Sequence, residues 1–109
     1  MNAHVGSDIF PSFVTSLPQA DLPMDGLRGW TLRAENMLVV FMAADRDVVV
    51  PEHHHGEQWG IVLEGEMDVT MHGRTQTYRR GDTHCIPAGV EHGAMIRAGW
   101  RGLYVFPRP

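Results

Sequence analysis

The feature that most constrains this fold is a series of short β-type segments, each ended by glycine, proline or another turn-forming residue. No stretch has a convincing helical period. Strands are expected at 27–34, 37–43, 48–50 with continuation into the histidines, 59–63, 66–72, 75–79, 83–86, 92–96 and 102–106. Many short strands at regular spacing predict an all-β sandwich or barrel.

The length and net charge of the chain limit which binding partners and which cellular location we expect. The 109 residues suit one domain with one modest core. A formal net charge of −4 argues against nucleic acid, which requires a basic face. The N-terminus lacks the layout of a signal peptide, and no apolar run approaches the ~20 residues of a membrane helix. We therefore expect a soluble, cytoplasmic protein with no nucleic-acid or membrane partner.

The chain is expected to divide into an arm and a barrel. Residues 1–26 have weak periodicity and contain four turn formers, Pro11, Pro18, Pro23 and Gly26. We interpret them as an N-terminal arm, and residues 27–109 as the β-barrel domain. The single cysteine, Cys85, cannot form an internal disulfide, and we expect it to be a small buried apolar residue.

Three consecutive histidines, His53, His54 and His55, carry the strongest chemical signal in the sequence. Alternate side chains of an extended strand share a face, so His53 and His55 point the same way and His54 the other. Two imidazoles a few ångströms apart suit a transition metal. The alternative is a solvated histidine-rich surface tract.

A second stretch, ending at His92, strengthens the metal interpretation. Its spacing is Gly, five residues, Pro, any residue, Gly, two residues, His, formed by Gly81, Pro87, Gly89 and His92. Together the two stretches resemble the two signature motifs of the cupin superfamily. The first of these motifs reads His-any-His, three or four residues, Glu, six residues and Gly, and is matched by His53, His55 and Gly65. The chain is similar to small bacterial single-domain cupins.

The sequence departs from the family motifs at three positions. Gln58 stands where the family usually has Glu, Asp47 replaces a leading Gly, and Ile96 replaces a closing Asn. A glutamine carbonyl oxygen can ligate a metal but brings no charge. The neighbouring Glu57 is the alternative ligand, because it carries the negative charge that a metal prefers.

The resemblance implies a jelly-roll β-barrel, a double-stranded β-helix. It also implies that four side chains converge at one end of the interior around one divalent transition metal ion (Zn, Fe, Mn or Ni): His53, His55, Gln58 and His92. His84 shares its strand face with Ile86 and is expected to face the interior. There it would act as a catalytic base or orient a ligand, and the alternative is a hydrogen-bonded core histidine.

The resemblance leaves the reaction open, because related sites host many chemistries. We expect a metal-dependent enzyme of isomerase, cyclase or lyase type, acting on an oxygen-rich small molecule such as a sugar acid or keto acid. The alternatives are a non-catalytic binding or sensing barrel and an Fe(II) dioxygenase, whose usual carboxylate ligand is missing if Gln58 is in place. A homodimer is also expected, because Trp59, Ile61 and Leu63 give one strand a second apolar face that needs a cover. The N-terminal arm is the alternative cover within the chain.

Overall fold

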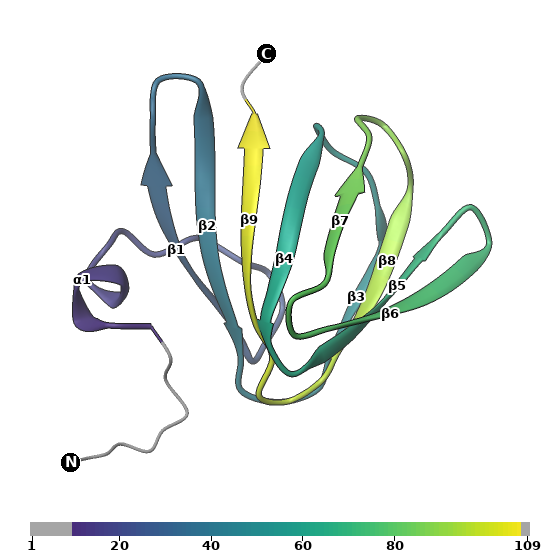
Figure 1. The fold of residues 1–109 in the computed structure, drawn as a ribbon, viewed down its shortest axis with the longest axis horizontal. Coiled ribbons are helices and arrows are strands. Elements are labelled where there is room, and N and C mark those ends of the chain that lie inside the picture. The colour runs from purple at the N-terminus through teal and green to yellow at the C-terminus, as the bar shows by residue number, and fades with distance from the viewer. Residues whose placement is uncertain (1–9, 108–109) are drawn as a thin grey trace.

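The computed structural model describes residues 10–107 and places them in two antiparallel sheets (Figure 1). The strands are β1 (Leu27–Arg33), β2 (Met37–Ala44), β3 (Val48–His53), β4 (Gln58–Glu64), β5 (Glu66–Met71), β6 (Arg74–Arg79), β7 (Thr83–Ile86), β8 (His92–Ile96) and β9 (Arg101–Pro107). One sheet has the order β1-β2-β9-β4-β7 and the other β3-β8-β5-β6. The predicted all-β jelly-roll barrel is confirmed, and the expected strands are present with small shifts at their ends.

Alternation along the strands builds the core between the two sheets. In β5, Met67 and Val69 are buried, whereas the intervening Asp68 is only half-buried and accepts a hydrogen bond from Thr77 on β6. The buried cluster contains Leu27, Ala44, Val48, Val62, Met67, Val69, Ile86, Ile96, Trp100 and Tyr104. Because successive side chains of a strand point to opposite faces, one apolar face of each sheet points inward, and the other face is left to solvent or to a further partner.

Residues 10–26 run along the edge formed by β1. Phe10 contacts Trp30 and Phe41 with ring-centroid distances of 6.0 and 5.6 Å, and the backbone amide of Ala20 donates to the carbonyl of Gly29. The first nine residues of the expected arm lie outside the described residues, and its boundary at residue 26 stays a prediction.

Two expectations about local structure were wrong. Ser12–Thr15 form a short helix, α1, although no helix was expected; four residues are too few for a helical period to be visible in the sequence. Cys85 is exposed rather than buried, because the alternation that turns its neighbours His84 and Ile86 inward turns Cys85 outward. Among residues 10–107, no helix has the length and apolar character needed to cross a membrane. The cytoplasmic location stays a prediction.

Candidate metal centre

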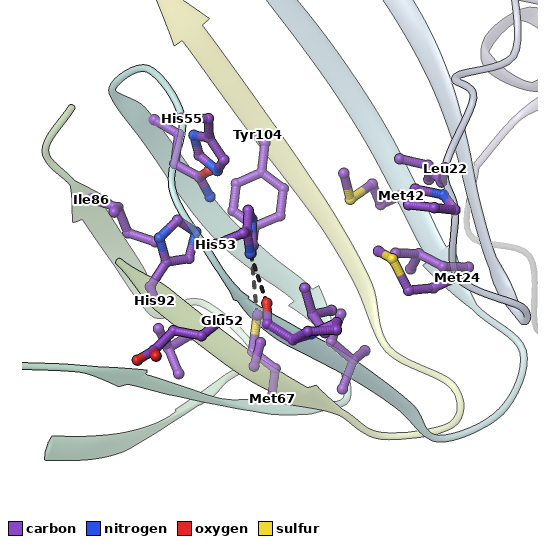
Figure 2. Close-up of a pocket in the computed structure, with 18 of the residues that line it drawn as sticks. Leu22, Met24, Met42, Glu52, His53, His55, Met67, Ile86, His92 and Tyr104 are labelled. Atoms are coloured by element: carbon purple, nitrogen blue, oxygen red, sulfur yellow. Dashed lines mark hydrogen bonds between the residues drawn. The ribbon is translucent and has the colours of Figure 1, made fainter. Parts of the chain in front are cut away.

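Three histidines meet at one end of the barrel interior. His53 closes β3 and His92 opens β8, and the two residues are direct partners in the antiparallel register. His55 approaches from the connection between β3 and β4. The ring centroids are 4.4 Å apart for His53 and His92, 4.8 Å for His55 and His92, and 5.1 Å for His53 and His55. One ring nitrogen from each lies within 4.8 Å of the others, and Figure 2 shows the three rings around the same space.

Hydrogen bonds to the backbone set the same tautomer in all three rings. Nδ1 lies 2.9 Å from the Pro51 carbonyl in His53, 2.7 Å from the Gly56 carbonyl in His55 and 3.0 Å from the Val90 carbonyl in His92. A carbonyl oxygen only accepts, so each Nδ1 must carry the proton and donate. Each Nε2 then keeps its lone pair. Backbone orientation of this kind is typical of metal-binding histidines.

The protonation state of His92 also suits a metal ligand. Burial holds the pKa of His92 below its usual 6.5, and the nearby His53 and His55 lower it further. The hydrogen bond to the Val90 carbonyl acts in the opposite direction. Because the net shift is downward, His92 is mainly neutral at pH 7 and can offer its lone pair without first losing a proton.

The backbone that carries His55 to the other two histidines is not the extended strand that was expected. The β3–β8 register shifts between Val50 and His53, and β3 ends at His53. His55 therefore lies in the connection and not on the strand. His53 and His55 still face each other, as the alternation argument expected, while His54 is exposed.

The two alternatives for the fourth ligand occupy different environments. Gln58 is the first residue of β4, is buried, and lines the same cavity as the three histidines. Glu57 is exposed and is not part of the histidine group. The environment therefore favours Gln58 over Glu57, and its role as a ligand stays a prediction.

His84 lies deeper in the same cavity, on β7 beside β4. It is buried together with Ile86, and its Nε2 is 3.5 Å from the hydroxyl of Tyr104. The ring of Tyr78 lies 4.7 Å from the His84 ring. Burial, and then the positive charge of protonated His92, lower the pKa of His84, so its imidazole is mainly neutral at pH 7. Within residues 10–107, its buried Nδ1 has no hydrogen-bond partner.

The sequence analysis did not identify several residues that line this cavity of about 440 Å³. Tyr104 and Phe106 face it from β9, and the same alternation turns Leu103 and Val105 to the opposite face of the sheet. Strand alternation in β9 was therefore a usable signal for the two aromatic residues. Leu22 and Met24 reach the cavity from the segment before β1, and no local pattern marks them.

A comparison with protein-family models matches residues 38–99 to the cupin domain family Cupin_2. That range contains the three histidines, Gln58 and His84. The match covers more than half of the chain. The comparison with curated protein sequences gives no match.

Many solved structures share the fold. An RmlC-like cupin from Shewanella frigidimarina has a TM-score of 0.77 and 25% identity, over 94% of this chain and 92% of that one. KdgF from a Halomonas species has a TM-score of 0.75 and 21% identity, over 87% and 91% of the chains. The polyketide cyclase RemF from Streptomyces resistomycificus has a TM-score of 0.74 and 23% identity, over 100% and 81%.

Proposed function

Because this chain belongs to the Cupin_2 family of cupin domains, we propose that it is a metal-dependent enzyme that moves a proton next to a carbonyl group of a small molecule. The reaction class is isomerisation, cyclisation or elimination. The observation that carries the proposal is the set of three Nε2 lone pairs, each left free by a backbone hydrogen bond from Nδ1, at one end of the barrel cavity. The identities to KdgF and RemF are below 25%, so the proposal rests on the site.

The donor set fits one divalent transition metal ion. His53, His55 and His92 would hold it through Nε2, and the Gln58 amide oxygen is the candidate fourth ligand. Three imidazoles and a neutral oxygen suit Zn, Fe, Mn or Ni. When bound, the ion supplies Lewis acidity that stabilises negative charge on a carbonyl oxygen. An Fe(II) dioxygenase is less favoured, because the carboxylate of Glu57 is in solvent.

His84 is the proposed proton acceptor. A neutral imidazole is the basic form, and burial favours that form at pH 7. Its Nε2 is in contact with the hydroxyl of Tyr104, whereas its Nδ1 has no partner among residues 10–107. A buried polar atom without a partner is costly and needs an explanation. Proton exchange with a bound ligand provides one.

We also propose that the protein is a homodimer through the outer face of the larger sheet. The register aligns one outward residue from each strand in a continuous row: Leu32, Val39, Val105, Trp59 and Cys85. Leu32 and Trp59 remain 48% and 38% exposed. A second copy, related by a two-fold axis, would cover this apolar row.

The first experiment measures metal by elemental analysis of protein purified without an affinity tag. We expect one ion per chain in the wild type and in His54→Ala, whose exposed side chain comes from the same stretch. His55→Ala and His92→Ala should each lose stoichiometric metal. Full metal content in the His53→Ala/His92→Ala double variant would disprove the ligand assignment.

The second experiment tests proton transfer. The metal-loaded protein is incubated with a panel of carbonyl compounds in D₂O, and exchange of the hydrogen next to the carbonyl is followed by NMR. We expect hydrogen exchange with the wild-type protein. In His84→Asn, the exchange rate should fall by about 10²-fold or more while the metal content is unchanged. If no compound in the panel exchanges, or if His84→Asn exchanges at the wild-type rate, the assignment of the proton acceptor fails. A binding or sensing barrel would then be the better description.

A further inference from the structure

The barrel cavity has a neighbour on the surface of the molecule. A groove lies between residues 17–22 and the strands β1 and β2, and several of its lining residues are exposed, among them Gln19, Asp21 and Leu32. Of the described residues, three line both the groove and the barrel cavity: Leu22, Met42 and Phe106. The partition between the two spaces is therefore formed by these three residues.

Leu22 differs from the other two residues of the partition, because it does not belong to a strand. Met42 lies on β2 and Phe106 on β9, and these neighbouring strands are paired in one antiparallel register. Leu22 lies in the segment between α1 and β1, which crosses β1 and β2 in Figure 1. Figure 2 shows Leu22 with Met24 and Met42 on the side of the cavity opposite the three histidines, where they form an apolar wall. Leu22 is thus the part of the partition that can move without breaking a sheet.

This segment is fixed at its two ends and not in its middle. At one end the amide of Ala20 donates to the carbonyl of Gly29 over 2.8 Å, and at the other end the amide of Asp45 donates to the carbonyl of Gly26 over 2.8 Å. Within the described part of the chain, the main chain of residues 21–23 makes no hydrogen bond to another main-chain group. A stretch without such bonds opens at a lower free-energy cost than a paired strand does.

The side chain of Leu22 packs on the backbone of Gly29. Gly29 pairs with Met42, and both residues face the interior. A β-carbon on Gly29 would lie 3.0 Å from a methyl carbon of Leu22 and 3.1 Å from the β-carbon of Ala20. The contact that holds Leu22 in the partition is therefore close and apolar, and no hydrogen bond of this side chain is lost when it leaves.

The groove gives Leu22 a second place to pack. Leu17 and Leu38 line it, so a Leu22 side chain that turns from Gly29 into the groove exchanges one apolar contact for another. We propose that Leu22 is a gate, and that small molecules enter and leave the barrel interior through the groove, on the side away from the histidines. This inference goes beyond the proposed function and does not depend on it, because the gate uses neither a metal nor a histidine.

The test measures how fast a thiol inside the cavity reacts with methyl methanethiosulfonate. The exposed Cys85 is first replaced by serine, and Met67→Cys then introduces a thiol at a buried position that lines the cavity but not the groove. A parallel protein carries Val62→Cys, at a residue that is 1% exposed and lines neither space, so its rate reports global opening. Labelling of metal-free protein is followed by mass spectrometry. The rate at position 67 is divided by the rate at position 62 in the same background.

A matched pair of truncations identifies the gate. Leu22→Ala should raise the rate ratio by at least about tenfold, because the apolar contacts that hold the partition closed are lost. Leu27→Ala makes the same change at a buried residue that lines the cavity but not the groove, and it should leave the ratio unchanged. An equal rise in the two variants would mean a general loosening of the core, and no rise in Leu22→Ala would place the entrance at the histidine end. Either result refutes the gate.

Gly29→Ala distinguishes a moving gate from a hole made by truncation. It keeps Leu22 at full size but brings a β-carbon to 3.0 Å from it, so Leu22 must shift away from the backbone of β1. The rate ratio should rise several-fold. Gly56→Ala is the control, because a β-carbon there would meet no atom within 4 Å, and it should leave the ratio as in the parent protein. A ratio that Gly29→Ala does not change would show that displacement of Leu22 does not open the cavity, and it would overturn the inference.

Discussion

Replacing Gly60 by alanine should destabilise the protein, because this glycine makes room for the ring of Tyr104. Gly60 pairs with Tyr104 on β9 and with His84 on β7, all facing inward. A β-carbon on Gly60 would overlap the carbon atoms of the Tyr104 ring. That ring has little room to move, because His84, Trp100 and Phe106 lie around it with centroid distances of 5.6, 6.2 and 6.3 Å.

The size of the effect follows from two opposing terms. Overpacking of a dense core costs about 1–3 kcal/mol. The lower entropy of the unfolded chain after Gly→Ala offsets about 0.4–1 kcal/mol. The net loss in the free energy of unfolding is thus about 1–2 kcal/mol. For 109 residues, at about 2.1 cal/mol/K of unfolding entropy per residue, the melting temperature should fall by about 4–9 °C.

Urea unfolding and thermal melting of matched variants provide the assay. Gly56→Ala is the control, because a β-carbon there would meet no atom within 4 Å, and its stability should change by less than about 0.5 kcal/mol. In a Tyr104→Leu background, Gly60→Ala should cost less than about half of its cost in the wild type. An equal cost in both backgrounds would refute the steric explanation.

Three further predictions concern the site and the assembly. Gln58→Glu should raise the affinity for a divalent metal at least about tenfold by adding a negative ligand, whereas Glu57→Gln should leave it unchanged; the opposite pattern in metal titrations would identify Glu57 as the ligand. Because the pKa of His84 is lower in the folded state, the unfolded chain binds the extra proton first as pH falls below about 6.5. Metal-free protein should therefore lose stability below that pH until the folded pKa is passed, and the loss should be smaller in His84→Phe. Light scattering should show a dimer for the wild type and a monomer for the Trp59→Ser/Leu32→Ser variant, and a monomeric wild type at micromolar concentration would exclude the dimer.

Local rules were enough to locate most of the strands. The alternation of apolar and polar residues, together with the turn residues, predicted the strands to within a few positions. This works because the inward face of a strand is determined by the order of its own side chains. The same alternation turns Cys85 outward when His84 points inward, which is incompatible with the expectation that Cys85 is buried. The helix Ser12–Thr15 was beyond such rules, because four residues carry no period.

The resemblance of two sequence motifs to the cupin signatures was enough to group His53, His55 and His92 before any contact was known. Only the tertiary structure decided how they face one another, because β3 pairs with β8, which lies far from it in the chain. The carbonyls that orient each Nδ1 belong to residues only one or two positions away, where the backbone turns in a way that no sequence pattern marks. The tertiary structure also decided what lies opposite them. The apolar wall is assembled from a segment before β1 and from strands of both sheets, and its chemistry depends on which side chains those distant segments bring to one space.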